Sequence, residues 1–216
     1  CGIIGYVGEK GAYSILLSGL RKLEYRGYDS AGICTASNAS LVMNKKKGRV
    51  ENLASSFSPG TIGIAHTRWA THGQPIDKNA HPFVDEKNSI AVVHNGIIEN
   101  YLELKEGLRA GGVKFSSDTD SEVLVHLIAQ AYQGDLKEAV LRVIPKLRGA
   151  YAMVVMHKDT KELVGARNGS PLIIGIGESE NFLASDVSAV IEHTKKVVYL
   201  NDFEVACVGE KVKVYG

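Results

Sequence analysis

The sequence has little cysteine and no long apolar run. Its 216 residues include three cysteines, five prolines and one tryptophan. The cysteines, at positions 1, 34 and 207, are far apart and lack CxxC spacing, which argues against a disulfide framework or a zinc site. No apolar run approaches the roughly 18 residues of a membrane helix, and no signal-peptide pattern opens the chain. We therefore expect a cytoplasmic protein with reduced cysteines and no membrane partner.

An excess of charge of either sign is also missing. Lysine and arginine number 25 against 24 aspartates and glutamates, and the sequence pI is about 7.9. Such a balance gives no overall field for nucleic acid or an anionic surface, so we expect a small-molecule partner and no nucleic acid. The length suits one large domain with a substantial core, and no repeat, low-complexity tract or linker divides it.

Short apolar stretches dominate what is present. Ten of them, rich in β-branched residues and flanked by turn formers, predict buried strands: GIIGYVG, AGICTAS, TIGIAHT, SIAVVHNG, AYAMVVMH, ELVGAR, PLIIGIG, KVVYLND, EVACVG and KVKVYG. Apolar periodicity predicts helices over 12–23, near 50–57, over 101–108, from DTDSEV to Gly134, and in DLKEAVLRVIPKL after an Asp135-x-x-Glu138 capping pattern. About ten strands and about five helices indicate an α+β sandwich.

The first residue of the sequence is Cys1, for which three interpretations compete. It could be an arbitrary chain start, or a lipidated cysteine, although a lipoprotein would continue with a polar tether rather than the strand GIIGYV. The third interpretation is an N-terminal nucleophile. A terminal amine has a pKa of about 8, against about 10.4 for lysine, so an appreciable fraction is unprotonated at neutral pH. That amine could take the proton of its own thiol without a histidine.

Other parts of an acyl-transfer site have candidates, each with an ordinary structural alternative. Asn95 and Gly96 follow a strand and could offer an amide and an N–H to an oxyanion, or form a simple turn. The Arg68 guanidinium could bind a carboxylate, although a surface arginine is the common case, and Trp69 beside it would ordinarily be buried. Asp120 precedes a predicted helix, where capping is the usual role.

Six motifs, taken together and in their order along the chain, resolve this ambiguity: CGIIG, RGYDSAG, HTRWATHG, HNGIIEN, SDTDSEV and LRGAYA. By these motifs the chain resembles, over all 216 residues, the glutaminase domain of class II, N-terminal-nucleophile glutamine amidotransferases. The stretches LRKLEYRGYDSAG and IAHTRWATHGQP are most similar to the branch that aminates a sugar phosphate. The resemblance implies an α+β fold, a four-layer αββα sandwich of two antiparallel sheets.

The resemblance also implies roles for the catalytic and substrate-binding residues. Cys1 would be the nucleophile and its α-amine the general base, while Asn95 and the Gly96 N–H would form the oxyanion hole. Arg68 would bind the α-carboxylate of glutamine, and Asp120 its α-ammonium.

Further residues are implied near the substrate. Trp69, Thr71 and His72 would lie on a loop that covers glutamine. Arg26 would support the surroundings of the nucleophile, with an ordinary structural role as the alternative, and His81 is considered for the loop although packing is favoured. Three remaining residues are interpreted as core: His94, Cys34 and Cys207.

The implied reaction is hydrolysis of L-glutamine to glutamate and ammonia through a γ-glutamyl thioester, without a metal or organic cofactor. In the complete enzyme, a covalently linked isomerase part would use the ammonia to convert fructose 6-phosphate to glucosamine 6-phosphate. We expect residues 1–216 to be the glutaminase domain alone. Two alternatives stay open: the glutaminase domain of another class II amidotransferase, and an amino-acid-binding module without turnover.

Overall fold

Two antiparallel sheets form the centre of the computed structural model, which describes residues 1–216. The first sheet has seven strands in the order β11 (Val197–Tyr199), β9 (Ile173–Ile176), β10 (Glu180–Ala184), β1 (Gly2–Gly8), β4 (Ile62–Arg68), β2 (Ser30–Ser37) and β3 (Ser40–Lys47). The second has six, in the order β13 (Val212–Tyr215), β12 (Val205–Val208), β8 (Leu163–Asn168), β7 (Tyr151–His157), β6 (Ile90–Gly96) and β5 (Phe83–Val84). All named strand pairs are antiparallel.

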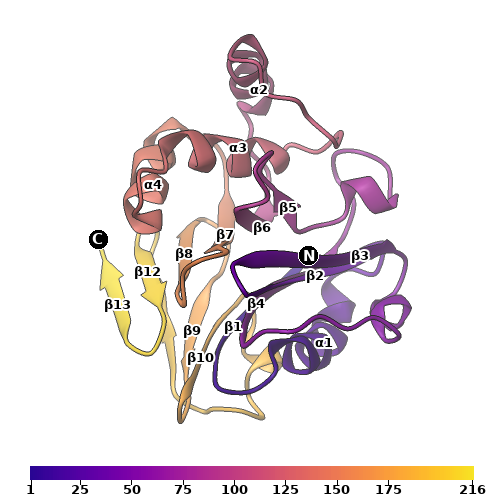
Figure 1. The fold of residues 1–216 in the computed structure, drawn as a ribbon, viewed down its shortest axis with the longest axis vertical. Helices are drawn as coiled ribbons and strands as arrows, with labels where there is room; N and C mark the ends of the chain where they lie inside the picture. The colour runs from indigo at the N-terminus through magenta and orange to yellow at the C-terminus, as the bar shows by residue number, and fades with distance from the viewer.

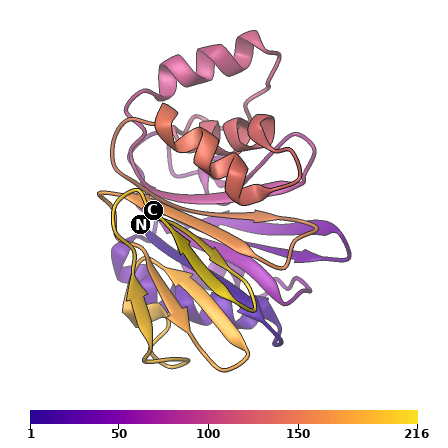
Figure 2. The ribbon, with the colours of Figure 1, turned by 90° about the vertical axis from the view of Figure 1, so that its left-hand side faces the viewer.

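Helices cover both outer faces of the stacked sheets. Helix α1 (Ala12–Leu23) packs on the seven-stranded sheet, and α3 (Glu122–Ala131) and α4 (Leu136–Val143) pack on the six-stranded sheet. Helix α2 (Tyr101–Ala110) lies against α3. Figures 1 and 2 show α1 on one side of the sheets and the other three helices on the opposite side. The predicted four-layer αββα sandwich is therefore confirmed.

Strand alternation builds three apolar layers from this arrangement. In β1, Ile3 points into a cluster of 19 buried residues between the sheets, while Ile4 points into a cluster of 18 residues beneath α1. In β6, Val93 joins the layer between the sheets and Val92 joins the 21 residues under α3 and α4. Burying each such side chain contributes roughly 1.5–3 kcal/mol, so these layers fix the strands that carry the site.

All ten predicted strands are present, and three further strands were not predicted. Strand β3 is an edge strand whose exposed end is lysine-rich, a pattern that protects edges but hides their apolar alternation. Strand β5 is only two residues long. Strand β10, of sequence ENFLA, is central and buried although it has no β-branched residue, because its neighbours β1 and β9 determine its conformation.

The helix predictions were mostly right. Helix α1 has the predicted bounds, and the Asp135 carboxylate caps α4 by accepting the Glu138 backbone N–H at 3.0 Å. The helix expected near 50–57 is wrong, because the structure has only a 3-10 turn there, Val50–Leu53. Serines follow this turn, and their hydroxyls compete for the backbone hydrogen bonds of a helix. In total there are four α-helices and five 3-10 helices, and no helix has both the length and the apolar character needed to cross a bilayer.

Candidate active site

Cys1 is held at the start of a central strand. Its α-amine donates a hydrogen bond to the Arg26 backbone carbonyl. Burial lowers the pKa of this amine from 8.0 to about 6, and the nearby Arg26 charge adds to the effect, while Asp29 opposes it. At neutral pH most of the amine is therefore unprotonated, and it lies on the same residue as the thiol.

The Cys1 thiol lies against the end of β4. The Trp69 backbone N–H donates to the Cys1 Sγ at 3.3 Å, a contact that favours negative charge on sulfur. The other two cysteines differ, because burial raises the pKa of both the Cys34 and the Cys207 thiol to about 12. Both are packed in strands as small apolar side chains, as predicted. Cys1 alone combines accessibility with an adjacent base.

A short 3-10 turn, Glu24–Arg26, positions the Arg26 carbonyl that accepts the hydrogen bond from the Cys1 α-amine. The next residue, Gly27, lies so close to β4 that a Cβ there would be 2.7 Å from the Arg68 carbonyl carbon. Glycine at this position thus allows the turn to pack against the strand end that faces Cys1.

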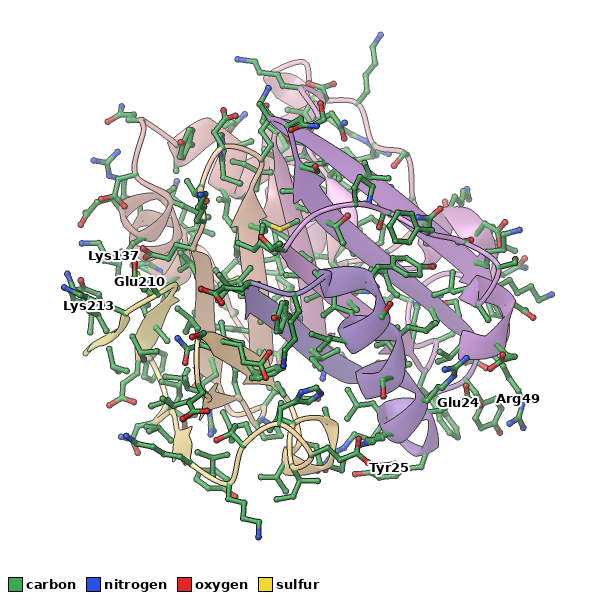
Figure 3. The ribbon with its side chains drawn as sticks, turned by 60° about the horizontal axis from the view of Figure 1, so that its bottom comes forward. Glu24, Tyr25, Arg49, Lys137, Glu210 and Lys213 are labelled. Carbon is green, nitrogen blue, oxygen red and sulfur yellow. The ribbon has the colours of Figure 1, made fainter.

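Charged side chains fix the same turn. Glu24 pairs with Arg49 at 3.1 Å, and Figure 3 shows the two side chains together near Tyr25. On the other side, the Arg26 guanidinium donates to Asp186 Oδ2 at 3.1 Å, and the Tyr25 hydroxyl donates to the same oxygen at 2.6 Å. Asp186 therefore holds Arg26, whose charge acts on the amine.

Asn95 and Gly96 end β6 opposite Cys1. The Asn95 Nδ2 donates to the Cys1 carbonyl oxygen at 3.4 Å. Gly96 has φ of +105°, and a Cβ there would lie 2.1 Å from the Ala150 carbonyl oxygen, so only glycine fits. Because Ile97 N–H donates to that same oxygen at 3.0 Å, alternation in the ladder directs the Gly96 N–H away from β7.

A small cavity lies beside Cys1 and Gly96. Its lining includes Cys1, Gly96, Thr71 and two buried residues of opposite charge, Arg68 and Asp120. The Asp120 Oδ2 accepts the Ile98 backbone N–H at 2.8 Å, and its Oδ1 lies 3.9 Å from His72 Nδ1. Asp120 is not the N-cap of α3, because the residue directly before that helix is Ser121. Capping therefore does not explain this aspartate.

Arg68 also organises the loop that follows it. Its guanidinium donates to the backbone carbonyls of His72, Gly73 at 3.0 Å and Gln74 at 3.2 Å. Trp69 lines the cavity and is 53 % exposed, so the ordinary alternative of a buried tryptophan does not apply. Thr71 and His72 lie on the same loop; Thr71 lines the cavity, and His72 lies near Asp120.

Three buried histidines lie behind the oxyanion candidates. The His81 ring stacks on the His66 ring with centroids 3.9 Å apart, and His81 Nδ1 accepts the His94 backbone N–H at 3.3 Å. His94 Nδ1 is 2.7 Å from the Ser121 Oγ, while its Nε2 has no partner. Burial lowers the pKa of His94 to about 4, so this ring is neutral at pH 7.

Sequence reasoning missed two residues that contact the site. The His66 Nε2 lies 3.0 Å from the Asn95 Oδ1. The Asp29 Oδ2 accepts the Ala70 backbone N–H at 2.8 Å, which shapes the turn after Trp69. Both residues lie inside motifs that were singled out, HTRWATHG and RGYDSAG, but nothing in the one-dimensional pattern shows which backbone groups they reach.

A larger surface hollow lies elsewhere, between α4 and the β12–β13 hairpin. Lys137, Glu210 and Lys213 line it, on the far side of the molecule from Tyr25 in Figure 3. Its only thiol is Cys207, whose pKa burial raises to about 12. This hollow has no paired nucleophile and base, whereas the small cavity at Cys1 has both.

Solved structures support the fold. A glutamine phosphoribosylpyrophosphate amidotransferase from B. subtilis, solved with ADP and GMP, matches with a TM-score of 0.86 and 28 % identity over 100 % of this chain and 49 % of that chain. The structure of the allosteric regulatory enzyme of purine biosynthesis matches with a TM-score of 0.88 and 29 % identity, over 100 % of this chain and 48 % of that one.

Curated relatives are more similar in sequence. The glutamine–fructose-6-phosphate aminotransferase (isomerizing) of Aquifex aeolicus is 54 % identical over 95 % of this chain and 36 % of its own length. The enzyme of the same name from Thermus thermophilus is 54 % identical over 95 % of this chain and 35 % of its own length. The chain thus spans about a third of the length of these relatives. Residues 66–192 match the model of the glutamine amidotransferase domain, and the chain belongs to that family.

Proposed function

We propose that this chain hydrolyses the side-chain amide of L-glutamine, with Cys1 as the nucleophile. The observation that carries the proposal is the α-amine of Cys1, whose pKa burial lowers to about 6 while its own thiol remains accessible. A base already unprotonated at neutral pH, on the same residue as a thiol, is the pairing that acyl transfer needs.

The proposed reaction begins when the thiol proton passes to the α-amine and Cys1 Sγ attacks the glutamine amide carbon. The carbonyl π electrons move to oxygen, and the Asn95 Nδ2 and Gly96 N–H stabilise the resulting oxyanion. When the tetrahedral intermediate collapses, the C–N bond breaks and the ammonium form of the amine gives its proton to the departing ammonia. Water, deprotonated by the amine, then attacks the thioester and releases glutamate and the Cys1 thiol. Nothing in these steps requires a metal or organic cofactor.

Two opposite charges in the cavity support recognition of a free amino acid. Arg68 would bind the α-carboxylate, and Asp120, which also lines the cavity, would bind the α-ammonium. A peptide-linked glutamine has neither charge and would leave both buried charges without a counter-ion from the substrate. Trp69, Thr71 and His72 would cover the bound substrate, because Arg68 holds their loop at the cavity mouth.

We further propose that the ammonia serves an amination of fructose 6-phosphate to glucosamine 6-phosphate in a longer protein. The curated relatives carry that substrate in their names and extend well beyond the matched region. Residues 1–216 would be the glutaminase domain, and a covalently linked isomerase part would hold the sugar phosphate.

The test is paired release of ammonia and glutamate from glutamine by a chain whose free Cys1 is verified by intact mass. Equal amounts of both products are expected, and none with Cys1→Ala. Retention of a methionine before Cys1 should also abolish turnover, because the base would become an amide nitrogen. Cys34→Ser should lower stability and leave the chemistry intact.

Normal turnover by the methionine-retaining chain would exclude the α-amine as the base. Absence of ammonia release by the unmodified chain, combined with measurable glutamine binding, would instead support the amino-acid-binding module.

A further inference from the structure

His66 lies in β4, fully buried, behind the proposed oxyanion hole. Its Nε2 is 3.0 Å from the His94 carbonyl oxygen and 3.0 Å from the Asn95 Oδ1. Its Nδ1 is buried and has no hydrogen-bond partner. The reaction steps above leave this residue without a role, although it contacts a proposed oxyanion donor directly.

The His94 carbonyl determines which nitrogen of His66 carries the proton. A carbonyl oxygen can only accept a hydrogen bond, so the His66 Nε2 facing it at 3.0 Å must be the N–H. The other tautomer would place the Nε2 lone pair against that oxygen and bury the single N–H, now at Nδ1, without an acceptor. Burial also lowers the pKa of His66 well below 6.5, which keeps the ring neutral.

The same N–H then determines the orientation of the Asn95 amide. An Nε2–H attracts the amide oxygen and repels the amide NH₂, so the Asn95 Oδ1 faces His66. Because the two ends of the amide point in opposite directions, Nδ2 is left facing Cys1, where it donates to the backbone carbonyl at 3.4 Å. A rotated amide would turn its acceptor toward the developing oxyanion and repel it.

We propose that His66 is a positioning residue, which fixes the Asn95 side chain so that its NH₂ faces the reacting carbonyl. This inference rests on the proposed function and adds to it a residue that never touches substrate. The surrounding packing supports it, because the His81 ring stacks on His66 at 3.9 Å with an angle of 15° between the planes. The imidazole is thereby confined to one plane while its Nε2 reaches both oxygens.

His66→Phe tests the proposal, because phenylalanine retains a flat ring for the stack on His81 and removes both nitrogens. The kcat for glutamine hydrolysis should fall about 10-fold, as expected from loss of one buried hydrogen bond, with KM changed less than about twofold. His66→Gln, which can still present an N–H to both oxygens, should recover most of the lost kcat. His157→Phe is the control. His157 is also buried, and its ring stacks on Tyr132 with centroids 4.7 Å apart, but it pairs with Ile90, at the end of β6 away from Asn95.

A double-mutant cycle separates positioning from general destabilisation. If His66 acts only through Asn95, His66→Phe should have no further effect on kcat in an Asn95→Ala background. An aldehyde analogue of glutamine gives a second measurement, because Cys1 adds to the aldehyde and places an oxyanion in the hole. His66→Phe should weaken its inhibition about 10-fold and leave inhibition by glutamate unchanged.

Equal losses of kcat from His66→Phe with and without Asn95 would overturn the proposal, as would a loss that His66→Gln does not recover. Should His66→Phe fail to fold, the kcat of His66→Gln is compared with that of Asn95→Ala instead. The proposal predicts near-normal kcat for His66→Gln. A loss of kcat in His66→Gln as large as that in Asn95→Ala would count against the proposal. Failure of the proposed function looks different. In that case the unmodified chain releases no ammonia, or Asn95→Ala alone leaves kcat unchanged.

Discussion

Cys1 brings together the two chemical groups that most hydrolases take from separate residues. Its Sγ accepts a hydrogen bond from the Trp69 N–H, and its amine donates one to the Arg26 carbonyl. Burial and a neighbouring guanidinium both disfavour the ammonium form. The consequence is an amine that is mostly unprotonated at neutral pH and suited to the proposed role of base, and the position of its titration is measurable.

The pH dependence of kcat/KM should reflect this amine. As pH falls, protonation removes the base, so activity should be lost with a midpoint near pH 6 rather than near the ordinary value of 8.0. Arg26→Gln keeps the backbone carbonyl but removes a positive charge, and should therefore raise the midpoint. The measurement is glutamine hydrolysis from about pH 5 to about pH 9 in both proteins. A midpoint near 8.0 in the unmodified chain, or a lower one in Arg26→Gln, would contradict this account.

Oxyanion and head-group contacts should separate kinetically. Asn95→Ala removes the proposed oxyanion donor, which would act only in the transition state, so kcat should fall about 10²- to 10³-fold with a small change in KM. Asp120→Asn retains an acceptor for the Ile98 N–H but loses the charge that pairs with an ammonium, so KM should rise more than kcat falls. Steady-state kinetics of ammonia release distinguish these patterns. Unchanged kcat in Asn95→Ala would remove Asn95 from the mechanism.

At the scale of elements, the site is assembled from strand ends and turns. Strand β1 begins at the cavity, β4 and β6 end there, and the residue before α3 borders it. The helices contribute support from the far side of each sheet. A helix remote from the cavity should therefore affect stability without affecting chemistry.

Helix α4 allows that separation to be tested. Asp135→Ala removes the acceptor of the Glu138 N–H and should cost about 1 kcal/mol, a decrease in melting temperature of roughly 2–4 °C. Asp135→Asn retains a capping oxygen and is the matched control. Calorimetry and kcat measured on the same preparations check both halves of the prediction. A large change in kcat without a change in melting temperature would connect α4 to the site.

The whole molecule decides where the site can exist. Gly2 pairs with Thr67 across β1 and β4, which brings the chain start beside Arg68, and β6 approaches from the second sheet. The apolar layer between the sheets holds these two halves together. Both sheets and their helices build this one sandwich, and the proposed function places the sugar-phosphate site in another part of a longer protein.

Hydrolysis and amination should therefore separate in this chain. It should release ammonia from glutamine, and adding fructose 6-phosphate should give no glucosamine 6-phosphate and leave the ammonia rate nearly unchanged. If the sugar phosphate binds only in another part of a longer protein, as proposed, it has no site here and cannot shift a conformational population of this chain. Ammonia assays with and without the sugar phosphate, with mass spectrometry of products, test this. Formation of the amino sugar by these 216 residues would overturn the domain assignment.

Sequence alone determined the ten apolar strands, the bounds of α1 and the capping of α4, because these depend on local periodicity and on one side chain reaching a nearby N–H. It also determined the family, since six motifs in order leave little freedom. It did not reveal β10, whose extended form comes from its neighbours.

Only the tertiary structure decided the environment of the chemical groups. The lowered pKa of the Cys1 amine comes from burial and a charge 25 residues away along the chain. The bond between His66 and Asn95 joins residues on two different sheets, 29 positions apart. Desolvation and hydrogen bonding depend on what surrounds a group in space, and for these residues the surroundings come from distant parts of the chain.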